Sequence, residues 1–216
     1  MSKVFFPSCK VTAHFPEASR KLKAYIEQHE GAVTTGCCKL NLQNLSKDDT
    51  ALVVCNSCGA YIDESAASEK LEFVWTIIDN DPDFALPDHH GEQMTLQDCW
   101  RAFDRSDLQD TVRSLLRKMN IEIVELEENR EKTRFCGAGV LRACSDLEKQ
   151  LAPQRYGIGG AGIYQPMETE EQDRWLREWC GQIKTEKVVT YCPGCYDGIK
   201  RGGKAAVHLL ELVFPS

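Results

Sequence analysis

The chain has 216 residues, of which 42% are hydrophobic and 27% charged, as in an ordinary globular protein. Its formal net charge is −7 and no basic run offsets it, so we expect no nucleic-acid binding. The apolar run Val4–Phe6 is too short for the core of a signal peptide, and no stretch approaches the roughly 20 apolar residues of a membrane span. We therefore expect a cytoplasmic protein with no membrane span.

Eleven cysteines are the most unusual feature of the composition. An odd number excludes complete disulfide pairing within one chain, and a reducing compartment disfavours disulfides in any case. Metal, cluster or redox chemistry is therefore the better explanation for this cysteine content.

The first part of the chain alternates short apolar runs with helical patterns. Strands are expected at Lys3–Phe6, Ala32–Thr35 and Ala51–Val54, and helices at Pro16–His29, which Gly31 should end, and at Gly59–Ala67. Lys39–Asp49 is expected to be a loop or to contain a short helix, and Lys70–Ile78 fits either a helix or a strand. Asp79–Gly91 is rich in Asp, Pro and His and reads as a linker, which divides the chain into a first half, 1–85, and a second half, 92–216.

The second half repeats this alternation. Strands are expected at Met94–Leu96, Ile121–Leu126 and Lys187–Thr190, and helices at Ser106–Met119, near Val140–Leu151, at Thr169–Thr185 and at Ala205–Val213. Ser106 is a plausible N-cap, Thr169 with Gln172 has the form of a capping box, and Tyr156–Tyr164 reads as a glycine-rich loop.

Cysteines occur in the same order in both halves: a single cysteine, a pair or its remnant, then Cys-x-x-Cys. The first set is Cys9, Cys37, Cys38, Cys55 and Cys58, and the second is Cys99, Cys136, Cys192 and Cys195. Phe135 stands where the second set would have the first cysteine of its pair. The repeated order indicates an internal duplication. Because each half alternates strands and helices, we expect an α/β fold of two tandem Rossmann-like subdomains with mostly parallel sheets.

Each cysteine motif follows an expected strand, at the sheet edge where open α/β folds bind ligands. A Cys-x-x-Cys pair can chelate one metal ion or one edge of a cluster, and both clusters and structural zinc take about four thiolates. Structural zinc is therefore an alternative at either set. Cys192-Pro193-Gly194-Cys195 also fits a thioredoxin-like dithiol, although this interpretation leaves the other cysteines unexplained.

The order of motifs resembles the cysteine-rich CCG domain, which occurs in tandem in one of the subunits of heterodisulfide reductases. The resemblance covers nearly the whole chain. It rests on Thr95–Arg101 (TLQDCWR) as "HDxC", Phe135–Gly139 (FCGAG) as "CCGxGG", Cys192–Cys195 as the second CxxC, and His208–Leu212 (HLLEL) as "HxxELL".

The resemblance implies that Cys9, Cys37, Cys38, Cys55 and Cys58 ligate a noncubane [4Fe-4S] cluster. Cys99, Cys136, Cys192 and Cys195 would hold a conventional cluster, a zinc ion or nothing. It also implies a role as an oxidoreductase subunit that passes electrons to a small-molecule or protein disulfide. Because the chain has no ferredoxin-type cysteine run, its electrons would come from an iron–sulfur or flavin partner. A non-catalytic scaffold or regulatory module stabilised by zinc or a cluster is the alternative.

Overall fold

The computed structural model describes residues 2–65 and 67–215. Its first sheet has four parallel strands in the order β2-β1-β3-β4 within the described residues. These strands are β1 (Lys3–Phe6), β2 (Val33–Thr34), β3 (Thr50–Val53) and β4 (Lys70–Phe73). The central strand β3 is apolar and buried, as expected for a parallel sheet covered on both faces.

The second sheet has the same plan. Four parallel strands lie in the order β6-β5-β7-β8 in the described part of the chain. They are β5 (Gln93–Gln97), β6 (Glu122–Glu125), β7 (Lys187–Thr190) and β8 (Ala205–His208). In both sheets the order is second, first, third and fourth strand of the half. The predicted fold class, two duplicated Rossmann-like subdomains with parallel sheets, is therefore confirmed.

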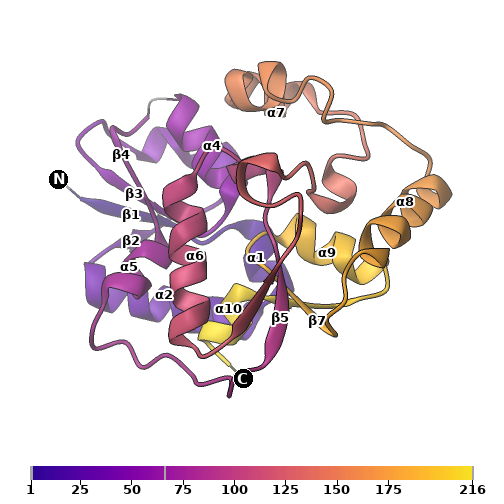
Figure 1. Ribbon diagram of the computed structural model, residues 1–216. Coiled ribbons are helices and arrows are strands. Elements are labelled where there is room, and N and C mark those ends of the chain that lie inside the picture. The colour runs from indigo at the N-terminus through magenta and orange to yellow at the C-terminus, as the bar shows by residue number, and fades with distance from the viewer. Residues whose placement is uncertain (1, 66, 216) are drawn as a thin grey trace.

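Helices connect and cover the strands (Figure 1). In the first half they are α1 (Cys9–His14), α2 (Pro16–Glu30), α3 (Cys38–Asn41), α4 (Asn56–Ser65) and α5 (Val74–Asn80), with the 3-10 turn η1 (Leu42–Asn44). In the second half they are α6 (Ser106–Lys118), α7 (Asp146–Leu151), α8 (Thr169–Gly181), α9 (Pro193–Arg201) and α10 (Leu209–Val213). The second half also contains the short helical turns η2 (Trp100–Ala102), η3 (Arg130–Lys132), η4 (Gly137–Gly139) and the π-helical η5 (Pro153–Ile158).

Most elements of the first half agree with the prediction. The ambiguous segment Lys70–Ile78 divides into β4 and α5, so each interpretation holds for part of it. Cys9 follows β1, as expected, and it begins α1, with Ser8 accepting a hydrogen bond from the backbone of Val11. The predicted helix Gly59–Ala67 contains position 66, which lies outside the described residues, as do Met1 and Ser216 at the ends of the predicted halves.

The second half contains the larger errors. The last predicted helix, Ala205–Val213, is wrong over its first four residues, which form β8 because parallel pairing with β7 overrides their helical propensity. The helix expected near Val140–Leu151 is only α7, and the expected loop Tyr156–Tyr164 begins inside η5. Neither predicted cap forms, because Arg105 and Glu168 occupy the N-cap positions of α6 and α8.

The two halves pack against each other through buried side chains. Phe15, which ends α1, stacks on His208, with ring centroids 4.6 Å apart. His208 is fully buried at the end of β8 and caps α10, where its Nδ1 accepts a hydrogen bond from the Leu210 backbone. In the described part of the chain, no helix has the length and apolar character needed to cross a membrane.

Burial lowers the pKa of His208 to about 3, so this side chain is neutral in the folded protein near pH 7. The unfolded chain binds its proton near pH 6.5, and stability is therefore lost as pH falls from about 6.5 toward 3. We expect His208 to contribute about 2 kcal/mol of the loss in unfolding free energy between pH 7.5 and 5.

This contribution can be measured by urea unfolding at the two pH values. His208→Asn retains a capping side chain but does not titrate, so its loss of stability should be smaller than that of the wild type by this amount. His90→Asn, at an exposed position, is the matched control. An identical pH dependence in His208→Asn and the wild type would contradict the prediction.

Candidate metal and cluster sites

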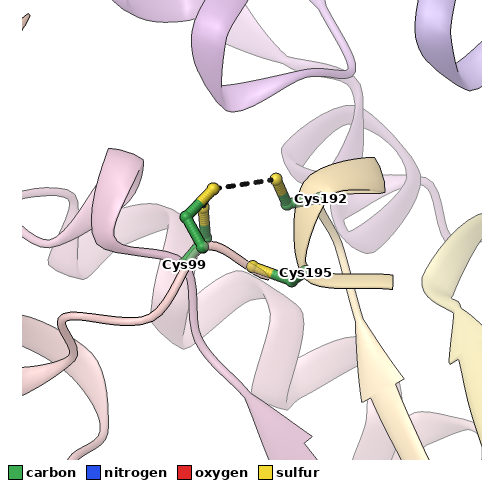
Figure 2. Close-up of side chains that lie close together, drawn as sticks. Cys99, Cys192 and Cys195 are labelled. Carbon is green, nitrogen blue, oxygen red and sulfur yellow. Dashed lines mark hydrogen bonds between the residues drawn. The ribbon is translucent and has the colours of Figure 1, made fainter. Parts of the chain in front are cut away.

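Four buried cysteine thiols of the second half converge on one point. The sulfur atoms of Cys99, Cys136, Cys192 and Cys195 all lie within 4.8 Å of one another. The four residues are at most 2% exposed. Figure 2 shows the thiols of Cys99, Cys192 and Cys195 pointing toward each other, the last two from the beginning of α9.

The spacing of these sulfurs can be compared with that of a tetrahedral metal site. Zinc–thiolate bonds of about 2.3 Å place the sulfurs of a tetrahedral site about 3.8 Å apart. Two of the separations are 3.6 Å between Cys99 and Cys136 and 3.9 Å between Cys136 and Cys192, and none exceeds 4.8 Å. A cluster in which each thiolate bonds a different iron would hold the sulfurs farther apart. These four residues could hold a metal ion or, with a wider spacing, a cluster.

Parallel strands and glycines bring these cysteines together. Cys99 follows β5, and Cys192 follows the adjacent strand β7 and occupies the N-cap position of α9. Cys136 is distant along the chain and arrives on the loop before η4. Gly137 makes this approach possible, because it has a φ of +55° and a Cβ there would lie 2.0 Å from the Gly194 carbonyl oxygen. The loop can therefore pack directly against α9 only with glycine at this position.

The pKa values of the four thiols are shifted in different directions. Hydrogen bonds from Cys192, Cys195 and Cys99 lower the pKa of Cys136, and the positive charge of Arg101 acts in the same direction. Burial raises the pKa of Cys99 and of Cys195. A thiolate at Cys136 surrounded by donor thiols is a suitable start for metal binding, since the metal then displaces the remaining protons.

A buried polar network supports this group from behind. Asp98, directly before Cys99, is fully buried and forms an ion pair of 2.7 Å with Arg113. Its carboxylate also accepts a hydrogen bond of 2.8 Å from the hydroxyl of Tyr191, the residue before Cys192. Arg113 binds Glu125 as well, at 2.7 Å. The network therefore holds the two segments that carry Cys99 and Cys192, which follow the adjacent strands β5 and β7.

Sequence reasoning assigns no role to Arg113 or Tyr191. Arg113 lies on a helix in which the apolar residues alone show helical periodicity. The sequence pattern therefore does not indicate that this arginine is buried. Tyr191 could have been noticed, because it separates a buried strand from Cys-x-x-Cys and needs a partner for its hydroxyl group.

Phe135, which the sequence comparison of the two halves aligns with the first cysteine of the pair, lies among aromatic rings. Its ring is fully buried and stacks on Trp179, with ring centroids 5.0 Å apart, and Trp175 continues the stack. The indole of Trp179 is held by a hydrogen bond of 2.8 Å to Gln97. Since aromatic rings occupy this space, the second set is complete with four thiols.

The five cysteines of the first set are arranged differently. Cys38, Cys55 and Cys58 are buried, Cys37 is half-buried and Cys9 is exposed. In the described residues only the second set has its sulfurs within 4.8 Å of one another, so these five thiols do not close around one point. Hydrogen bonding with the Cys58 thiol, which lies between them, lowers the pKa of Cys55 to about 6 and also lowers the pKa of Cys38.

Instead, all five thiols line a pocket of about 230 Å³. The carboxyl end of the first sheet forms one side of this pocket, and Cys192, Pro193 and Arg101 of the second half form part of the other. The first helices after β1 and β7, α1 and α9, are in contact at this place (Figure 1). The two groups of cysteines are therefore neighbours, and Cys192 belongs to the lining of both.

Comparison with protein-family models, curated proteins and solved structures gave no match to this chain. The fold and the site define its class: a duplicated α/β protein with a buried four-cysteine site that can hold a metal ion or a cluster.

Proposed function

We propose that this chain is an iron–sulfur redox protein of the kind represented by the CCG-domain subunit of heterodisulfide reductases. The observation that carries the proposal is the pocket lined by Cys9, Cys37, Cys38, Cys55 and Cys58. Five thiols around an open volume exceed what one zinc ion needs, whereas a noncubane [4Fe-4S] cluster would use all of them. Such a cluster supplies one-electron chemistry, and here it would serve a disulfide or similar acceptor.

The two cysteine sets would then have different occupants. The four thiols of the second set have the spacing of a single tetrahedral ion, and we propose zinc there. The structural ion would fix Cys192 and α9, which form one wall of the pocket. The first set would carry the redox chemistry next to this rigid wall.

The exposure of the first set supports access from solvent. Cys9 is exposed and Cys37 is half-buried, while Cys38, Cys55 and Cys58 are buried. A substrate would thus approach from the side of Cys9, where Lys10 and Lys39 also line the pocket. Electrons would arrive from a partner with ordinary clusters or flavin, since the sequence has no ferredoxin-type cysteine run.

The test is the metal content of anaerobically prepared protein, with EPR of the wild type and Cys38→Ser. We expect about four irons with matching sulfide and one zinc per chain in the wild type. Cys38→Ser should lose or alter the iron signal and keep the zinc. Cys144→Ser, whose thiol lies outside both sets, should match the wild type. Zinc without iron, or an unchanged spectrum in Cys38→Ser, would refute the proposal.

A non-catalytic scaffold stabilised by metal is the second candidate. The observation that favours it is the complete burial of the four-cysteine site, which leaves no open position for a substrate. In that case a chelator would unfold the protein, and no redox signal would accompany the loss of metal.

A further inference from the structure

Arg101 lies between the two groups of cysteines. It follows Cys99 by two residues, in η2, and only 8% of its surface is exposed. Its guanidinium reaches Cys136 of the four-cysteine site and also lines the pocket of the first set. This charged group thus forms part of the partition between the two proposed centres.

The contacts of Arg101 differ from those of the other buried arginines. Arg113 and Arg155 form ion pairs with carboxylates. Arg101 instead donates from Nη1 to the Cys136 sulfur at 3.0 Å and lies over the ring of Tyr156, while its Nε has no hydrogen-bond partner in the described part of the chain. A buried guanidinium needs negative charge nearby, and the thiolates of the second set are the groups that supply it.

Two glycines leave room for this guanidinium next to the backbone. A Cβ at Gly139 would lie 3.1 Å from Nη2, and one at Gly194 would lie 3.5 Å from Nη1. Backbone on both sides therefore limits the movement of the planar group and directs it at Cys136. Lysine could supply the charge here but not the fixed planar donor.

A divalent ion with four thiolates leaves a buried net charge of −2, which a nearby cation stabilises. We propose that Arg101 is a positioning residue of the four-cysteine centre, which strengthens metal binding by its hydrogen bond to the Cys136 thiolate. This inference rests on the proposed metal occupancy of that centre. Outer-shell partners of metal ligands typically contribute about 10–100-fold to metal affinity, and we expect Arg101 to fall in this range.

The experiment uses Co²⁺ as the probe, in the full chain with Cys38→Ser, Cys55→Ser and Cys58→Ser, so that the four-cysteine centre alone offers four thiols. Arg101→Gln should bind Co²⁺ about 10–100-fold more weakly in chelator competition. It should keep the ligand-field bands of four thiolates, while the thiolate-to-cobalt charge-transfer band moves to lower energy because the sulfur loses a hydrogen bond.

The controls separate this role from a general effect on folding. Arg134→Gln removes the same charge at an exposed position two residues from Cys136 and should behave as the parent protein. Arg101→Lys should recover part of the affinity and not the band position. If Arg101→Gln binds Co²⁺ with equal affinity and its band does not shift, only the inference about Arg101 is overturned. A parent protein without the four-thiolate cobalt spectrum would instead overturn the proposed occupancy of the centre.

Discussion

Cys136→Ser is expected to abolish stable metal binding at the four-cysteine centre. Cys136 is the thiol that hydrogen-bonds both Cys99 and Cys192, at 3.6 and 3.9 Å, and the hydrogen bonds from the other thiols hold its pKa well below the usual value. The affinity should fall by more than the roughly 10–100-fold that follows loss of an outer-shell partner, since a ligand itself is removed.

Loss of the metal should also lower the stability of the protein. Binding free energy of a structural ion adds to folding free energy, and values of about 10–16 kcal/mol are known for four-ligand zinc sites. We therefore expect zinc to raise the urea midpoint of the wild type and of Cys144→Ser, and to leave that of Cys136→Ser almost unchanged. The measurement is urea unfolding with and without one equivalent of zinc. A full zinc response in Cys136→Ser would show that the centre does not use this thiol.

Arg113→Leu is expected to destabilise the protein by roughly 3–5 kcal/mol. The substitution removes the cation from a network in which Asp98 is fully buried, and it leaves that carboxylate without its charged partner. Asp98 would keep the hydrogen bonds from Tyr191 and from the Arg130 backbone, which do not neutralise its charge. Urea unfolding of the metal-loaded protein gives the free energy difference.

Two further variants test the cause of this loss. Arg117→Leu removes an exposed arginine from the same helix and should change stability by less than about 0.5 kcal/mol. The double variant Asp98→Asn with Arg113→Leu should be more stable than Arg113→Leu alone, because it leaves no unpaired buried charge. If the double variant is the less stable of the two, packing rather than charge accounts for the effect.

The sequence is most informative where local pattern and tertiary environment agree. Lys3–Phe6 and Lys187–Thr190 are predicted as strands with the bounds observed, because continuous apolar runs of this length suit buried parallel strands. Gly31 is predicted to end the helix before it, and it does so in the left-handed conformation. The prediction for Ala205–Val213 is wrong because its first four residues are strand only through pairing with β7.

The cysteine order by itself indicated that the chain is duplicated, and it predicted that the cysteine motifs follow the carboxyl ends of strands in both halves. It also predicted that Phe135 stands where the second set would have the first cysteine of its pair. These conclusions need only spacing and the geometry of parallel sheets.

Only the tertiary structure decided how the thiols are grouped. Sequence spacing says which cysteines are near a sheet edge, but separations between sulfurs depend on how loops and helices pack. The close contact of Gly137 with α9 gathers the second four thiols around one point. Because the two halves face each other, the five cysteines of the first set lie around a pocket. The same packing buries Arg101 between them, a position that no local pattern could predict.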